Sequence, residues 1–170
     1  SQIKIPPIHI MPDPKLNDIG KRRTALSSTW HKDNHSRDKM QQLRKNITNV
    51  FINRWKDSTV DTRLWTTFSQ TKDTLSNNGY ASKFLSYNAR ATNEYANAKY
   101  LAYCVNVFYS PDIAQFFAKR GYALDVDAHA LSDMVQWIWR SAIRNGDEIW
   151  IYIPSARMRN LLKEWMERFK

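Results

Sequence analysis

Three residues in the C-terminal half have types and a spacing suited to binding an anion. Gln136, Arg140 and Arg144 follow one another at intervals of four residues. On an α-helix such residues lie one above another, so their side chains could grip one anionic group together. Two guanidinium groups on one stripe repel each other, and a phosphate or carboxylate between them relieves that repulsion. The alternative is an ordinary solvated helix face with Asp133 as a partner.

A polar segment of small residues, 88–95, has a composition suited to contact with a sugar-phosphate backbone. Asn88, Thr92 and Asn93 can donate hydrogen bonds to phosphate oxygens, and Arg90 adds positive charge. The alternative is a loop closed by asparagine side chains that bond to their own backbone. The residue types leave both interpretations open.

Positive charge is concentrated in the N-terminal third of the chain. The 170 residues include 26 Lys and Arg against 16 Asp and Glu, and residues 1–60 alone hold 12 basic and 5 acidic side chains. Such asymmetry indicates a polyanionic partner, most often nucleic acid. The candidate phosphate contacts are Lys21, Arg22, Arg23, Arg44 and Lys45, and the candidates for stacking on bases are Trp30 and Trp55. The alternative is a well-solvated surface.

The sequence offers little for thiol or metal chemistry. Cys104 is the sole cysteine, which excludes an internal disulfide and a thiolate-rich zinc site and fits a reducing compartment such as the cytoplasm. It lies in an apolar segment, so we expect an inert buried thiol. His31 and His35 are four residues apart near Asp33 and Asp38, but no third histidine or cysteine is near. We therefore expect no metal site.

The apolar stretches are too short for a membrane protein. None approaches the roughly 20 residues that cross a bilayer, and there is no apolar signal region at the N-terminus. We expect a cytoplasmic protein without a membrane partner. The chain begins at Ser1 rather than methionine, which fits a processed product or part of a longer protein.

Short β-rich segments alternate with helical segments in most of the chain, and this order predicts an α/β fold with a mainly parallel sheet and helices on both faces. The expected strands are residues 64–68, 83–87, 100–108 and 148–153, and the expected helices are residues 37–55, 70–75, 111–121, 127–145 and 155–170. Residues 1–36 contain four prolines and no sustained period, which predicts a basic irregular arm or linker. We expect a basic amphipathic helix within residues 37–60 and one domain over residues 61–170.

The helix expected over residues 127–145 has two distinguishable faces. At about 100° per residue, Leu131, Met134, Val135 and Ile138 gather on one side, which predicts the face toward the sheet. Trp137 falls on the opposite side, with the polar stripe.

Several of these segments resemble the C-terminal RecA-like domain of superfamily 2 helicases. Residues 136–146, in which a glutamine is followed by two arginines and a terminal glycine, look like the sixth helicase motif. Residues 84–93 resemble the strand and loop of the fifth motif, and residues 64–68 resemble the opening strand of that domain. The sequences of residues 130–136 and 152–159 are also similar to the C-terminal ends of helicase-like replication proteins of bacterial phages and mobile elements.

The resemblance implies a RecA-like lobe that binds nucleic acid, and it assigns roles to two sets of residues. It implies that Gln136, Arg140 and Arg144 face an ATP molecule held by a separate N-terminal domain. It also implies that the loop from Asn88 to Asn93 holds a nucleic-acid strand, with DNA expected.

The parts that cradle ATP itself are missing from the sequence. It contains neither a GxxxxGK[ST] phosphate loop nor a DExx acidic motif, so ATP and Mg²⁺ are expected only through a missing N-terminal motor domain. We therefore expect a lobe that is not catalytic alone and whose partners are DNA and that motor domain or another replication protein. The alternatives are a stand-alone module that binds DNA or a replication partner, and a scaffold for an acidic protein.

Overall fold

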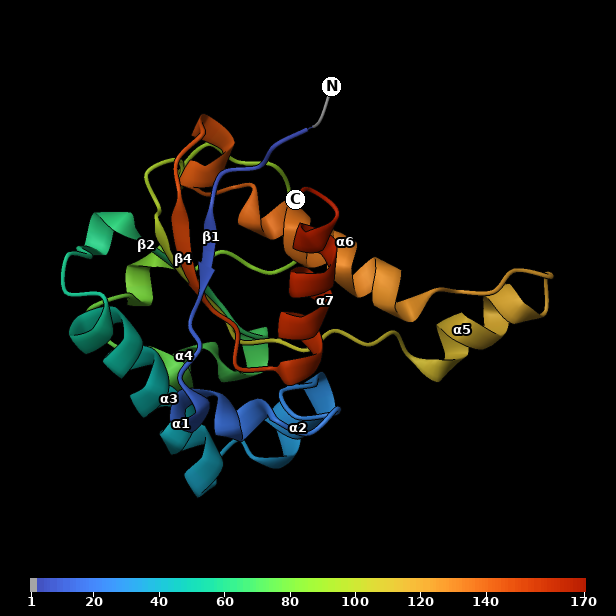
Figure 1. The fold of residues 1–170 in the computed structure, drawn as a ribbon. Coiled ribbons are helices and arrows are strands. Elements are labelled where there is room, and N and C mark those ends of the chain that lie inside the picture. Colours follow the sequence, from blue (N-terminus) through green and yellow to red (C-terminus); the bar gives the residue numbers. More distant parts are fainter. Residues whose placement is uncertain (1–2) are drawn as a thin grey trace.

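Four parallel strands form a single sheet in the computed structural model, which describes residues 3–170 (Figure 1). Their order across the sheet is β1, β4, β3 and β2. The strands are β1 (Ile8–Ile10), β2 (Arg63–Thr66), β3 (Tyr100–Tyr103) and β4 (Ile149–Tyr152). The expected α/β class with a parallel sheet is confirmed.

Helices cover both faces of this sheet. The α-helices of the described residues are α1 (Pro14–Asn17), α2 (Ser28–Asp33), α3 (Asp38–Asn49), α4 (Lys72–Leu75), α5 (Pro111–Ala118), α6 (Val126–Ile138) and α7 (Ala156–Glu167), and of these α5 lies away from the sheet. The chain crosses from β1 at one edge to β2 at the other through α1, α2 and α3, and then returns by β3 to β4. Because a parallel crossover is right-handed, the outward and return connections lie on opposite faces. Figure 1 shows α3 on one side of the sheet and α6 and α7 on the other.

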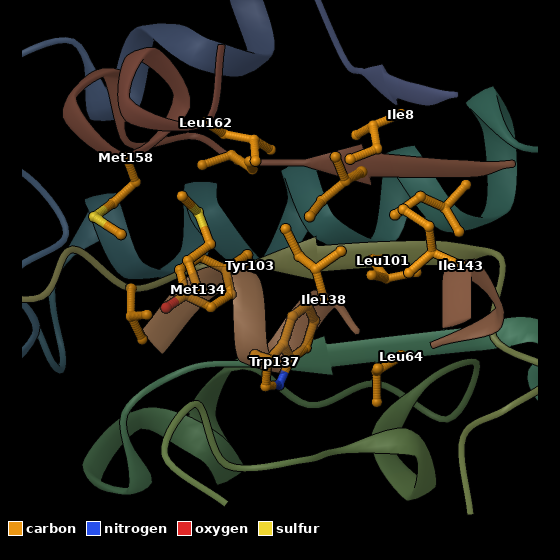
Figure 2. Close-up of a cluster of buried hydrophobic side chains, with 14 of the residues drawn as sticks. Ile8, Leu64, Leu101, Tyr103, Met134, Trp137, Ile138, Ile143, Met158 and Leu162 are labelled. Atoms are coloured by element: carbon orange, nitrogen blue, oxygen red, sulfur yellow. The ribbon is translucent and has the colours of Figure 1, made fainter. Parts of the chain in front are cut away.

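Two cores result, one on each face. On the α3 face, Met40, Leu43 and Ile47 pack on alternate strand residues such as Trp65 and Ala102. On the α6 face, residues of α6 and α7 pack on the opposite side chains of the same strands (Figure 2). The strands therefore have apolar side chains on both faces, as buried parallel strands do.

The N-terminal segment is more ordered than its sequence indicates. Residues 1–36 are expected to be irregular, and this is wrong for β1, α1 and α2; residues 1–2 lie outside the described part of the chain. β1 pairs in parallel with β4, with Ile8 opposite Ile149. It is only three residues long and lies between Pro7 and Pro12, and such short, proline-flanked strands belong at sheet edges.

The strand expected over residues 83–87 is also wrong. Residues Ala81–Lys83 form a 3-10 helix, and Phe84 makes a single bridge to Trp65. The turn before it buries Tyr80 completely, with its ring 5.1 Å from the Trp65 ring. Burial of that ring fixes the chain in a turn where the β-rich composition predicts a strand.

The segment that contains α5 projects from the body of the molecule (Figure 1). None of the residues of α5 is buried, although the helix is amphipathic and is capped by Ser110, whose Oγ accepts from the Ile113 amide.

No described helix combines the length and the apolar character needed to cross a membrane.

Candidate nucleic-acid interface

The helix expected over residues 127–145 ends earlier than its sequence predicts. α6 stops at Ile138, and residues Ala142–Asn145 form a separate 3-10 helix that ends at Gly146 with φ of +88°. The helix is interrupted between them because two hydrogen bonds replace the helical pattern. The Ser141 hydroxyl donates to the Ile138 carbonyl at 2.6 Å, and the Ala142 amide donates to the Ala98 carbonyl at 2.8 Å. Arg140 lies in the turn, so the expected stack of three side chains on one helix is wrong.

Gln136 lies in a different environment from Arg144. Its side chain is exposed on α6, its amide donates to the Ser132 hydroxyl at 3.1 Å, and it borders a pocket between α6 and α7. Arg144 instead extends from the 3-10 helix toward the loop that precedes β3. The structure therefore does not bring these two residues to one site.

Arg144 and its neighbour tie the 3-10 helix to the loop of residues 88–98. The Arg144 Nη1 donates to the Thr92 carbonyl at 3.2 Å, and the Asn145 Nδ2 donates to the Ala96 carbonyl at 3.2 Å. Ala98 ends this loop just before β3, and Gly146 ends the 3-10 helix just before β4. The two segments that resemble helicase motifs thus meet at the amino edge of the sheet.

Within that loop, some side chains bond locally and others are free. The Ser86 hydroxyl donates to Asn88 Oδ1 at 2.6 Å, and the Thr92 hydroxyl accepts from the Glu94 amide at 3.2 Å. Arg90 and Asn93 are exposed, and within residues 3–170 their side chains have no hydrogen-bond partner. Local bonding therefore occupies Asn88 and Thr92 in part, whereas Arg90 and Asn93 are available to a ligand.

The basic residues of the N-terminal third divide into separate groups. Lys21 and Arg22 border a pocket of about 610 Å³ at the carboxyl edge of the sheet. Arg23 points elsewhere, with its guanidinium 5.9 Å from the centre of the Phe108 ring. Arg44 Nε donates to the Ser76 carbonyl at 3.0 Å and so joins α3 to the end of α4, and Lys45 is exposed on α3 outside the pocket.

Two further basic residues of this pocket could not be predicted from the sequence. Lys15 and Lys39 line it together with Lys21 and Arg22. Each is an ordinary surface lysine in the sequence, and only the folding of α1, the loop after it and α3 brings them together. Of the two stacking candidates, Trp30 borders the pocket, whereas Trp55 is buried in the core against Phe51.

His31 is a structural residue. It is fully buried, with Nδ1 2.9 Å from the Thr71 hydroxyl and Nε2 3.0 Å from the Cys104 carbonyl. Because a carbonyl can only accept, Nε2 carries the proton and Nδ1 accepts from Thr71. Burial lowers the pKa of His31 from 6.5 to about 4, so the ring is neutral at pH 7. His35 bonds instead to the Gln70 carbonyl, and the two histidines do not face one ion.

Comparison with known proteins places the fold in a family. The family described as the YonV C-terminal Rossmann-like domain matches residues 3–166. The SPbeta prophage-derived uncharacterized protein YonV of Bacillus subtilis (strain 168) is 45% identical over 152 residues, which is 89% of this chain and 36% of that protein. The chain thus spans about a third of the length of this relative. No solved structure matches. This chain belongs to the family of YonV C-terminal Rossmann-like domains.

Proposed function

We propose that this domain is the nucleic-acid-binding C-terminal lobe of an ATP-dependent, helicase-like phage protein that acts in DNA replication or a related transaction. It does not hydrolyse ATP alone. The observation that carries the proposal is the contact between the loop of residues 88–98 and the 3-10 helix. These segments resemble the fifth and sixth helicase motifs, and they meet although about 50 residues separate them. The prophage-derived relative, of which this chain spans 36%, supports a role as one part of a longer protein.

The hydrogen bond from Arg144 to Thr92 suggests how the two activities are coupled. Arg140 and Arg144 supply positive charge to the phosphates of an ATP molecule held by the other lobe. Arg90 and Asn93 contact the nucleic-acid backbone. A strand that pulls on this loop shifts the Thr92 carbonyl and therefore the Arg144 guanidinium. Gln136, which lies away from this contact, stays a prediction as an ATP contact.

Nucleic-acid binding by this chain at several salt concentrations tests the proposal. We expect affinity for unrelated sequences to fall steeply between about 50 and 200 mM salt, because each neutralised phosphate releases counterions. The double variant Arg90→Ala/Asn93→Ala should bind more weakly than the wild type. A wild-type chain without measurable affinity for single-stranded or duplex DNA or RNA at 50 mM salt would overturn the proposal.

A further inference from the structure

The carboxyl ends of the strands are where ligands bind in open α/β sheets, and here part of that edge is filled by the chain itself. Gly20 packs against the segment after β4 so closely that a Cβ atom at this position would lie 1.9 Å from the Pro154 carbonyl oxygen. The Tyr152 hydroxyl donates to the Leu16 carbonyl at 2.5 Å in the same region. The crevice between β1 and β4 is therefore closed, and the open surface of this edge lies beside it.

One part of the open surface is a basic pocket, formed by Lys15, Lys21, Arg22 and Lys39. Among the residues that the structure describes, Asp18 is the single carboxylate that borders it, and its Oδ1 lies 3.1 Å from Lys21 Nζ. Within residues 3–170, the other three cations have no carboxylate within ion-pair distance. Unpaired cations grouped around one hollow favour a ligand with several negative charges.

A second part is an aromatic cleft of about 900 Å³. Its rings are those of Trp30, Phe68, Tyr87, Phe108 and Tyr109. They come from α2 and from the segments that follow β2 and β3, so the fold gathers them at the carboxyl edge. The remaining lining consists largely of hydroxyl and amide groups, with a single carboxylate. Flat rings beside neutral polar groups suit the faces and edges of nucleobases.

Trp30 and Thr24 line both the basic pocket and the aromatic cleft, so the two hollows lie side by side. The Trp30 ring is half-buried and packs edge-on against His31 at 5.2 Å. The Trp30 backbone amide donates at 3.1 Å to the Oγ of Ser27, the residue that caps the N-terminus of α2. Trp30 therefore stands on the boundary between the basic pocket and the aromatic cleft.

We infer that a single-stranded nucleic acid runs over this edge, with its bases in the aromatic cleft and its phosphates in the basic pocket. The inference rests on the proposed function, because it adds a second contact for the nucleic acid to the one proposed at Arg90 and Asn93 and says that the bound strand is unpaired. A duplex hides its base faces in the stack, whereas an unpaired strand can lay them on aromatic rings. This surface lies at the carboxyl edge, while the contact between Arg144 and Thr92 lies at the amino edge.

Fluorescence anisotropy with a labelled oligo-dT and with a labelled duplex tests the inference. We expect Lys15→Gln/Lys39→Gln to weaken oligo-dT binding on the order of 10-fold and to reduce its salt slope by about 1.4, since two phosphate contacts to a single strand are lost. The matched control is Lys56→Gln/Lys163→Gln, which removes the same charge from exposed positions outside both hollows. It should change affinity less than about 2-fold.

Trp30→Leu tests the stacking. We expect a loss of oligo-dT affinity on the order of 10-fold with little change for the duplex, and partial recovery in Trp30→Phe, which keeps a ring. Thermal unfolding of each variant, followed by circular dichroism, shows that the fold persists; Trp30→Phe keeps the test valid if Trp30→Leu does not fold.

Failure of the inference differs from failure of the proposed function. If the wild type binds no nucleic acid, both are wrong. If the wild type binds and the two lysine and tryptophan variants match it, while Arg90→Ala/Asn93→Ala is impaired, only the inference is wrong. Equal losses for oligo-dT and duplex in Trp30→Leu would also overturn the single-strand assignment.

Discussion

Arg157 holds the base of the projecting segment that contains α5. Its guanidinium is buried, and Nε and Nη2 donate to Asp127 Oδ1 at 3.0 and 2.8 Å. Nη1 donates to Asn106 Oδ1 at 2.8 Å and to the Val107 carbonyl at 2.6 Å. Asn106 and Val107 begin the projection and Asp127 follows it, so one side chain joins both of its ends.

We expect Arg157→Met to lower the free energy of unfolding by about 3 kcal/mol, because it leaves buried acceptors without donors. Asp127→Asn should cost less, since the Asp127 side chain is half exposed and an amide oxygen still accepts. Urea unfolding measures both. A loss below about 1 kcal/mol for Arg157→Met would show that the projection is held by other contacts.

The buried His31 makes stability depend on pH. Its pKa of about 4 in the folded protein lies below the unfolded value of 6.5. Between these two values the unfolded state binds a proton at His31 and the folded state does not. Stability is therefore fully present above pH 6.5 and is lost as the pH falls toward 4. By pH 5.5 the expected loss is about 1 kcal/mol.

Urea unfolding of the wild type and of His31→Gln between pH 7.5 and 5.5 checks this expectation. The variant is expected to be less stable throughout, but its stability should fall by about 1 kcal/mol less across the interval. Parallel pH curves for the two proteins would mean that His31 does not titrate in this way.

At the scale of elements, α6 shows how far a helical period predicts a buried face. The sequence predicts Leu131 and Val135 toward the sheet, and the structure leaves both half-buried while Ala130, Met134, Trp137 and Ile138 are buried. The face is rotated by about 70° from the expected one. Trp137 accounts for the rotation: its ring packs 5.2 Å from Tyr103, and its Nε1 donates to the Leu85 carbonyl at 2.9 Å. That acceptor is 52 residues away and is not visible in a local period.

The 3-10 helix after α1, Asp18–Gly20, depends on a close approach at Gly20. We expect Gly20→Ala to destabilise the protein by about 3 kcal/mol or more, because the added Cβ meets backbone atoms that cannot move independently. Gly121→Ala is the control: its φ is +80°, but no atom lies within 4 Å of the added Cβ, so only about 1 kcal/mol of backbone strain is expected. Thermal unfolding compares the two, and similar melting temperatures would contradict the packing argument.

At the scale of the whole molecule, the proposed coupling predicts different losses in the two segments that the contact between Arg144 and Thr92 joins. In a full-length protein that carries this domain together with an ATP-binding lobe, Arg144→Ala should reduce ATP turnover by roughly 10²-fold or more with little effect on nucleic-acid affinity. Arg90→Ala should reduce strand affinity and, with it, the stimulation of ATP hydrolysis by nucleic acid. If ATP turnover is undiminished when both Arg140 and Arg144 are replaced by alanine, the two arginines have no role in hydrolysis and belong to an ordinary solvated surface.

The sequence predicts the sheet class, β2, β3, β4 and most of the helices, because these segments have strong local patterns. It cannot predict β1, whose three residues acquire their structure only from β4. The same limit applies to the basic pocket, where Lys15 and Lys39 meet Lys21 through tertiary packing. It also applies to Arg44, a candidate phosphate contact whose side chain bonds to the end of α4.

The position of β4 between β1 and β3 has a consequence for how this protein is made. β4 is the last of the four strands to leave the ribosome, yet it is a central strand, and within residues 3–170 it is the sole partner of β1 in the sheet. During translation, the backbone groups of β1 and of the side of β3 that faces β4 remain unpaired until residues 149–152 emerge. Long-range pairing of this kind is slow and exposes strand edges to other chains. Nascent chains stalled before β4 are therefore expected to aggregate or to bind chaperones, and the emergence of residues 149–152 should be the step that makes the fold cooperative.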